Sequence, residues 1–276
     1  FIVMDNNKHT VAVIMSVYDG DEPYYFEKAI QSIQKQTYQS IDIYLYIDAV
    51  QRKDLLNRIR HYKKCSRFHV VTGDKKRGLA YGLNRLLDKI RGKGYGYIAR
   101  MDSDDISTTD RIESQVRFLE KNKNIDVIGT NCIEIDGDDN EIFYKKMPET
   151  HHELIKSIVK RSPFIHPSVM FRGSVVEHIR YNDSLMNTQD YYLWIDLLSK
   201  KYKFHNIQQP LLFFRVNDSF YARRGFGKLI NEVKSRLYAM KKLNKKNVKN
   251  YLYILALICL RLAPGNIKKY CYMRFR

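Results

Sequence analysis

A repeated alternation of strand-like and helix-like segments constrains the fold of this chain more than any other feature. Four segments rich in apolar residues have strand character, at 11–18, 41–47, 68–71 and 94–101. After each of them, apolar residues recur at helical spacing, which indicates a helix with one buried face. Strands and helices that alternate in this way predict a doubly wound α/β sheet with right-handed crossovers.

The fourth strand-like segment runs directly into three carboxylates, those of Asp102, Asp104 and Asp105. Clustered like charges are costly to remove from water unless a cation compensates them. If the strand geometry persists, Asp102 and Asp104 project to one face and offer the oxygen ligands that Mg²⁺ or Mn²⁺ prefers. The alternative is that the acids simply precede a helix, for which Ser107 and Asp110 form a fair capping box.

Other polar groups follow the remaining predicted strands. Tyr18 ends the first strand, Asp48 ends the second, and Arg77 follows the third. Because α/β sheets bind ligands at the carboxyl ends of their strands, these residues and the acidic loop predict a nucleotide site at one edge. The chain has no G-x-G-x-x-G sequence and no P-loop lysine, so a metal and basic side chains must neutralise a diphosphate there. The alternatives for Tyr18 and Asp48 are a core aromatic and a turn residue.

The second half of the chain shows no internal repeat or low-complexity linker, and we expect it to complete the same domain. A turn-rich segment at 136–140 lies between two strand-like runs and predicts a hairpin. Trp194 is spaced with Leu197 and Leu198 on one helix face and is expected in the core. The further expected elements are helices at 109–123 and 151–160, a helix starting near 187, and short strands at 203–207 and 211–216.

The positive charge is concentrated at the end of the chain. The formal net charge is +18, and residues 223–276 contain fifteen Lys or Arg against one acid, Glu232. A segment this basic binds polyanions, either nucleic acid or an anionic membrane surface. Its apolar run at 251–263 is too short to span a bilayer, which needs about 20 residues. We expect an amphipathic helix lying in the membrane interface, with a core helix as the alternative.

The cysteines and the start of the chain give weaker indications. The four cysteines are far apart and form no C-x-x-C motif, which favours a reducing cytoplasm over a disulfide framework or a zinc site. Residues 1–10 are featureless, and we expect them to be disordered or artificial and exclude them from the fold.

The combined motifs resemble those of the family 2 glycosyltransferases with the GT-A fold, especially bacterial enzymes that build lipid-linked O-antigen or exopolysaccharide repeats. The resemblance covers roughly residues 11–217. It rests on the order of its motifs: Ser16-Val17-Tyr18; Asp48; Gly78 with Asn84; Asp102-Ser103-Asp104-Asp105 as the D-x-D motif; His166-Pro167-Ser168; Gln189-Asp190-Tyr191-Tyr192-Leu193-Trp194; and Pro210-Leu211-Leu212 with Arg215. It implies a Rossmann-like mixed sheet flanked by helices.

The resemblance also implies roles for the donor-site residues. Tyr18 and Asp48 would hold the uracil of a UDP-sugar, in a nucleotide site that includes Ser16. Asp104 would be the direct ligand of Mn²⁺ or Mg²⁺, and Asp102 would help through the ribose or the metal's shell. The remaining expectations are Arg77 at the nucleotide, Arg215 at the diphosphate, and Asp105 with the helix that follows.

On the acceptor side, the resemblance implies that Asp190 is the catalytic base of an inverting displacement. A carboxylate at the start of a helix lies in a positive field that keeps it ionised. We expect His166 to be a hydrogen-bonded structural residue that lines the acceptor side. Arg223 and Arg224 are either solvated or contact a lipid-linked diphosphate. Two departures stand out, since Ala49 follows Asp48 where relatives often have Gly, and Gln189 precedes the base where relatives usually have Glu.

The resulting hypothesis is a metal-dependent, inverting glycosyltransferase that moves a hexose, with galactose or glucose favoured, from a UDP-sugar to a saccharide on a polyprenyl diphosphate. Its catalytic domain would span 11–222, divided into a nucleotide-sugar half at 11–105 and an acceptor half at 106–222. Residues 223–276 would attach it to the anionic cytoplasmic face of the bacterial inner membrane. The alternative is a protein that binds nucleic acid or another polyanion through this basic tail. It leaves Asp102, Asp104 and Asp190 without a role, and no nucleic acid is expected as a partner.

Overall fold

The four predicted strands of the first hundred residues lie side by side and parallel in a computed structural model that describes residues 9–185, 187–216 and 226–263. The strands are β1 (Val11–Tyr18), β2 (Ile41–Asp48), β3 (Phe68–Gly73) and β4 (Tyr97–Arg100). The crossover helices are α1 (Pro23–Gln34), α2 (Lys53–Tyr62) and α3 (Leu79–Ile90). The pattern of apolar runs therefore predicted this half correctly, because strands covered on both faces are apolar throughout.

The second half extends the same sheet with strands of both directions. Its strands are β5 (Ile106–Ser107), β6 (Val127–Ile135), β7 (Glu141–Lys145), β8 (Met170–Arg172) and β9 (Phe204–Arg215). The order across the sheet is β3-β2-β1-β4-β8-β6-β9-β5, with β7 paired to β6. β8 runs antiparallel to β4 and β6, whereas β6 and β9 are parallel. The sheet is mixed, as expected, and the predicted hairpin is formed by β6 and β7.

Strand β9 corrects one prediction. The sequence predicted two short strands around Pro210, because proline lacks the N–H that a strand interior uses. The structure contains one strand in which Pro210 lies opposite Asn131, where the pairing register with β6 shifts on both sides of Asn131. The irregular pairing at this position accommodates the missing donor, so the strand continues to Arg215.

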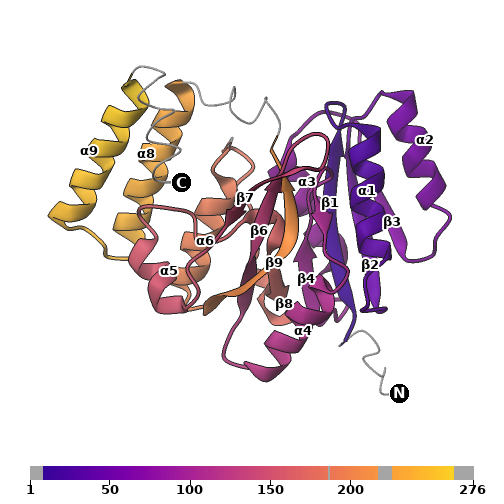
Figure 1. Ribbon diagram of the computed structural model, residues 1–276, viewed down its shortest axis with the longest axis horizontal. Coiled ribbons are helices and arrows are strands. Elements are labelled where there is room, and N and C mark those ends of the chain that lie inside the picture. Colours follow the sequence, from indigo (N-terminus) through magenta and orange to yellow (C-terminus); the bar gives the residue numbers. More distant parts are fainter. Residues whose placement is uncertain (1–8, 186, 217–225, 264–276) are drawn as a thin grey trace.

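Helices cover both faces of the sheet (Figure 1). The remaining helices are α4 (Arg111–Lys121), α5 (His151–Ser157), α6 (Gln189–Ser199), α8 (Phe226–Lys242) and α9 (Val248–Leu262), with 3₁₀ segments at His166–Ser168 and Gly173–His178. Side chains of β1 alternate between two apolar clusters, one shared with α1, α2 and α4 and the other with α3, α6 and α8. Trp194 is fully buried in the second cluster, as predicted.

The start of α4 differs from the expected capping box. Asp110 occupies the N-cap position but makes no side-chain capping bond, and Ser107 belongs to strand β5. The hydroxyl of Ser107 instead lies 3.4 Å from the sulfur of Met101 in the interior. The acidic residues before it therefore lead into a strand and not into a helix.

The C-terminal helix α8 packs against α6, and α9 packs against α8, at the end of the molecule opposite α1 and α2 (Figure 1). Ile254 of α9 is buried, and Arg261 of α9 forms an ion pair of 2.9 Å with Glu232 of α8. The predicted helix over 251–263 is thus present, with one face packed on the domain. Among the described residues, every helix is too short or too polar to cross a membrane.

Candidate functional site

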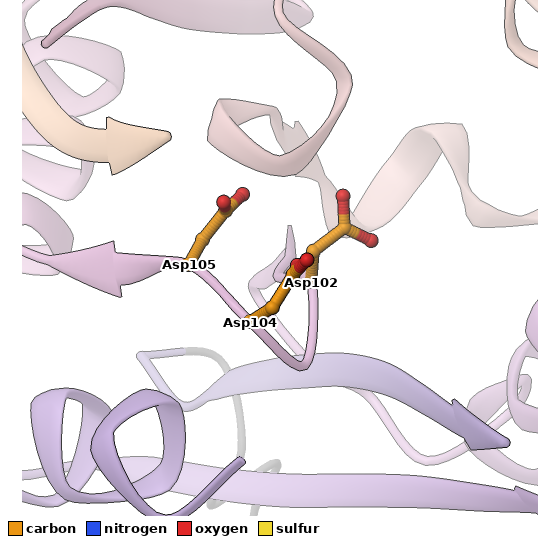
Figure 2. Close-up of side chains that lie close together, drawn as sticks. All are labelled: Asp102, Asp104 and Asp105. Carbon is orange, nitrogen blue, oxygen red and sulfur yellow. The ribbon is translucent and has the colours of Figure 1, made fainter. Parts of the chain in front are cut away.

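The acidic residues after β4 form one cluster at the carboxyl end of that strand. One oxygen from each of Asp102, Asp104 and Asp105 can be chosen so that all three lie within 4.8 Å of one another. Figure 2 shows the three side chains projecting from a single turn of the chain toward the same side. The prediction that Asp105 belongs with the following helix is wrong, because this residue is buried and leads into β5.

Two buried arginines, Arg100 and Arg215, form hydrogen bonds with the acidic loop. Arg100 is fully buried, forms an ion pair with Asp102, and donates to the carbonyl oxygen of Met101. Arg215 donates from its backbone N–H to Asp105 at 2.8 Å and from Nε to the carbonyl oxygen of Asp104 at 2.9 Å. Hydrogen bonds to the backbone fix the course of the loop, so the carboxylates are held in position before any ligand arrives.

The environment of Arg215 corrects the expectation that it contacts a diphosphate. Its side chain is 0% exposed, and its two Nη atoms donate at 2.6 Å to the carbonyl oxygen of Asp136 and to the carboxylate of Asp139. The guanidinium also stacks 4.0 Å from the ring centroid of Tyr25. With its three nitrogens bonded inside the protein, Arg215 braces the acidic loop and does not face a ligand.

The raised pKa values of two carboxyl groups in the cluster indicate that a cation would stabilise their ionised forms. Burial, followed by the charge of Asp102, raises the pKa of Asp104 to about 6, and burial raises the pKa of Asp105 well above its ordinary value. The Oδ2 atom of Asp105 is buried and has no hydrogen-bond partner among the described residues. Carboxylate oxygens that are crowded, buried and unpartnered fit a divalent cation, which would supply the charge and the coordination that they lack.

A fourth carboxylate, which the sequence did not single out, joins this site from the loop after β1. Asp21 accepts hydrogen bonds from Ser103 Oγ at 2.8 Å and from the backbone N–H of Tyr18 at 3.0 Å. Burial raises the pKa of Asp21 to about 7, and the charges of Asp104 and Asp102 add to the effect. The only sequence signal was its place just after a predicted strand, in a segment that has the composition of a turn.

Tyr18, whose backbone N–H donates to Asp21, is the last residue of β1. It is 39% exposed, which excludes the alternative of a core aromatic. A Cβ atom at Gly20 would lie 2.4 Å from the Tyr18 ring, so only glycine lets the ring fold over the turn. Lys76 Nζ lies 5.6 Å from the ring centroid. Ser16 lies farther back in β1, where a Cβ atom on Gly82 of α3 would be 3.0 Å from its hydroxyl.

Asp48 organises the loop that follows β3. Its two carboxylate oxygens accept the backbone N–H groups of Arg77 and Gly78, each at 2.8 Å. Gly78 has a φ of +83°, which favours glycine, and is the N-cap of α3. The exposed guanidinium of Arg77 lies 4.9 Å from the ring centroid of Tyr81. Ala49 adopts a left-handed φ of 51°, so the turn after β2 is formed with a strained alanine.

Asp190 lies in the first turn of α6, and its side chain is partly buried. It is near enough to the acidic loop for the charge of Asp102 to affect its pKa. Burial is the main cause that raises its pKa, the charge of Arg236 opposes this, and the charge of Asp102 adds to it. A carboxylate with a raised pKa at a helix N-terminus can accept a proton from a hydroxyl group.

Tyr181, whose raised pKa is due mainly to burial with a contribution from the charge of Asp190, is hydrogen-bonded to two other residues. His166 Nε2 lies 2.9 Å from the hydroxyl of Tyr181, and Asn84 exchanges hydrogen bonds of 2.8 and 2.9 Å with the backbone of Tyr181. Burial holds the pKa of His166 well below its ordinary value, so the ring is neutral. The bond to Tyr181 agrees with the prediction that His166 is a hydrogen-bonded structural residue. Arg223 and Arg224 lie outside the described residues.

Comparisons with known proteins place these motifs in a family. The family model described as glycosyl transferase family 2 matches residues 12–184. A Haemophilus influenzae protein described as an uncharacterized glycosyltransferase is 30% identical over 269 residues, which are 96% of this chain and 98% of the relative. An Escherichia coli protein named UDP-Gal:alpha-D-GlcNAc-diphosphoundecaprenol beta-1,3-galactosyltransferase is 28% identical over 276 residues, with 98% of each chain covered.

Solved structures share the fold at low sequence identity. A shortened form of S. aureus TarS in complex with UDP matches with a TM-score of 0.65 and 13% identity, over 97% of this chain and 75% of that chain. This chain spans 44% of a longer TarS structure. Mannosyltransferase PcManGT from Pyrobaculum calidifontis, in complex with GDP-Man and Mn²⁺, matches with a TM-score of 0.60 and 13% identity, over 98% of this chain and 80% of that chain. The shared architecture is the GT-A fold.

Proposed function

The chain belongs to glycosyl transferase family 2, and from this premise we propose that it is a metal-dependent, inverting hexosyltransferase that uses a UDP-sugar donor. The observation that carries the proposal is the acidic cluster, whose three carboxylates approach within 4.8 Å at the carboxyl end of β4. The names of two similar proteins support a uridine donor, since one contains UDP-Gal and the other describes a complex with UDP.

In the proposed donor site, Asp104 and Asp102 hold Mn²⁺ or Mg²⁺, and the unpartnered oxygen of Asp105 lies close enough to contribute. When bound, the cation supplies Lewis acid help for the departing UDP. Tyr18 offers an exposed ring for stacking on uracil. Asp48 positions the backbone that carries Arg77, and each of its oxygens keeps a lone pair for a base N–H.

Asp190 is the proposed catalytic base of a single displacement. It takes the proton from the acceptor hydroxyl, whose oxygen then forms a bond to the anomeric carbon of the donor sugar. The bond between that carbon and the diphosphate oxygen breaks, and UDP leaves with the electron pair. Attack from the face opposite UDP inverts the configuration. One base is sufficient for this reaction, so no nucleophilic carboxylate is required.

The proposed acceptor is a saccharide on a polyprenyl diphosphate, and the proposed sugar is galactose or glucose. The Escherichia coli relative supports this, because its name contains both a uridine galactose donor and a diphosphoundecaprenol acceptor. We place the enzyme in surface polysaccharide synthesis, peripherally at the cytoplasmic face of the bacterial inner membrane. His166 would line the acceptor side, and Arg223 and Arg224 would lie near the lipid-linked diphosphate. Residues 11–105, 106–222 and 223–276 would serve donor, acceptor and membrane, respectively.

A donor screen tests the proposal. The purified protein, with Mn²⁺ and a synthetic lipid-diphosphate saccharide, is offered a panel of UDP- and GDP-sugars, and release of the nucleoside diphosphate is measured. Faster release from one UDP-hexose than from every GDP-sugar, and only when the acceptor is present, is the expected result. Release that is independent of metal and acceptor would contradict the proposal. Anomeric analysis of the product by NMR tests inversion.

A further inference from the structure

A basic cavity lies apart from the acidic loop, between α5 and the segment that connects β7 to α5. Its volume is about 540 Å³, and it is lined by four cationic side chains, those of Lys146, Lys156, Lys160 and Arg161. All four residues are exposed. A concave surface lined by several cations attracts an anion more strongly than separate surface lysines do.

The two acids of the cavity, Glu149 and Glu153, offset only part of the charge of its four cations. Glu153 caps α5, where its Oε2 accepts the backbone N–H groups of Glu149 and Thr150 at 3.0 Å. Glu149 lies 3.9 Å from the ring of His205. Among the described residues, no ion pair within 4.0 Å involves Lys146, Lys156 or Lys160. The cavity therefore carries a net positive charge.

Gln208 adds an uncharged polar group to the lining. Its Nε2 donates to the carbonyl oxygen of Met147 at 3.2 Å, whereas its Oε1 is buried and accepts no hydrogen bond within the described part of the chain. The buried oxygen does not face the cavity, so the cations alone set the ligand preference of the cavity. Several cations around one concave surface fit a phosphate group, as in the phosphoglycerol headgroup of an anionic lipid.

Helix α9 lies directly beside this cavity. The hydroxyl of Tyr253 donates to the carbonyl oxygen of Lys160 at 2.7 Å. The inner face of α9 buries Ile254, but Val248, Leu252, Leu255 and Leu262 are each more than half exposed. Their spacing of four, three and seven residues places them in one row along the helix. A row of exposed aliphatic side chains marks a surface that is covered in use.

We propose that the basic cavity and the exposed row of α9 form one docking surface for an anionic lipid bilayer. The cavity would take the phosphoglycerol headgroup of a lipid, and the row on α9 would enter the interface. This deepens the proposed function, on which it rests, by naming the membrane contact that would hold the enzyme beside a lipid-linked acceptor. Amphipathic helices that lie in a membrane interface combine such an apolar face with basic residues.

The charge around α9 favours a bilayer over a second copy of the chain. Lys241 and Lys242 end α8, Lys245 and Lys246 lie between the two helices, and Lys249 is in the first turn of α9. Two copies that met through α9 would bring these like charges together, which opposes association. An anionic leaflet neutralises the same charges, and each one near the surface strengthens binding about fivefold.

Point substitutions test this surface better than truncation does. Removing the chain after Asn250 would also remove buried Ile254 and the Arg261–Glu232 ion pair, so loss of membrane binding could follow from unfolding. The full chain is therefore mixed with vesicles of phosphatidylcholine, with or without phosphatidylglycerol, and the bound fraction is measured by flotation. One variant carries Lys156→Glu and Lys160→Glu, and a second carries Leu252→Gln and Leu255→Gln.

The matched control carries Lys63→Glu and Lys64→Glu. These exposed lysines lie at the end of α2, on the opposite side of the molecule from α9 (Figure 1). The control changes the net charge as much as the cavity variant does. Thermal unfolding establishes that every variant is folded, and UDP release with a water-soluble acceptor establishes that the catalytic site is intact.

We expect the wild-type chain to bind vesicles only when phosphatidylglycerol is present, and the cavity variant to bind at least about tenfold more weakly than the control. The Leu252 and Leu255 variant should also bind at least about tenfold more weakly. Equal binding by the cavity variant and the control would overturn the proposal, as would wild-type binding to pure phosphatidylcholine. So would a wild-type dimer, seen by light scattering, that the leucine variant dissociates. Vesicle binding without UDP release would instead overturn the proposed function and leave this surface in place.

Discussion

The hydroxyl of Ser103 donates a hydrogen bond of 2.8 Å to the carboxylate of Asp21, and this bond joins the loop after β1 to the acidic loop after β4. The same carboxylate oxygen accepts the backbone N–H of Tyr18 at 3.0 Å. One side chain thus connects the aromatic residue proposed for uracil to the residues proposed for the metal. This bridge would hold the proposed uracil site and the proposed metal site at a fixed separation.

Ser103→Ala should weaken the affinity for UDP with Mn²⁺ by about fivefold to tenfold, because one hydrogen bond contributes on the order of 1 kcal/mol. Titration calorimetry measures the change. Ser66→Ala, at an exposed position between α2 and β3, is the control and should bind like the wild type. If both variants bind equally well, the bridge does not position the donor site.

Asp190→Asn should lower the rate of sugar transfer by at least about hundredfold, because the amide cannot take the proton of the acceptor hydroxyl. The affinity for UDP should stay within about twofold of the wild type, since a change in the base leaves the donor contacts intact. Asp183→Asn, at an exposed position, is the matched control. Loss of both transfer and UDP binding would show that Asp190 belongs to the donor site.

The pH dependence of transfer should follow the ionisation of Asp190. Burial raises the pKa of this carboxyl, so it becomes protonated at a higher pH than an ordinary aspartate does. Only the ionised form acts as a base, so kcat/KM should be constant at higher pH and fall as the pH drops through that raised pKa. Initial rates at saturating Mn²⁺ measure the profile. A rate that increases on acidification would contradict this role.

Arg215→Met should destabilise the folded protein by about 2–6 kcal/mol, because it leaves the carbonyl oxygens of Asp104 and Asp136 without their donor, at a cost of about 1–3 kcal/mol each. Asp139 keeps its ion pair with Lys28. Urea denaturation measures the free energy of unfolding. Arg77→Met is the control, since its exposed guanidinium should matter for UDP and change stability by only about 0.5 kcal/mol. A stable Arg215 variant that loses UDP binding would restore the diphosphate role that the structure argues against.

Local patterns in the sequence predicted the nucleotide-binding half of the fold correctly. Strands β1, β2 and β4 are apolar because both of their faces are covered, and the helices between the strands have one apolar face each. The position of the acidic loop follows from this topology alone, because parallel strands end at one edge of the sheet. The same patterns failed at Pro210, where irregular pairing with β6 keeps a strand intact across a residue that usually ends one.

Contacts between distant residues were beyond such reasoning. Arg215 and Asp105 are 110 positions apart, and nothing in either segment indicates that they are bonded. Asp21 and Ser103 are separated by 82 positions, so the segment around Asp21 showed only the composition of a turn. Asp105 was assigned to a helix because acids often precede helices, whereas the chain here enters β5.

The most direct test of the account measures the melting temperature with UDP and Mn²⁺, separately and together. A ligand at about 100 times its Kd stabilises the folded state by about 2.7 kcal/mol, so the two together should raise the melting temperature of the wild type by several degrees. Asp104→Ala should remove this shift, and Asp110→Ala, at an exposed position before α4, should keep it. An unchanged shift in Asp104→Ala, or a wild type that responds to oligonucleotides but not to UDP with Mn²⁺, would contradict a metal-dependent nucleotide-sugar site.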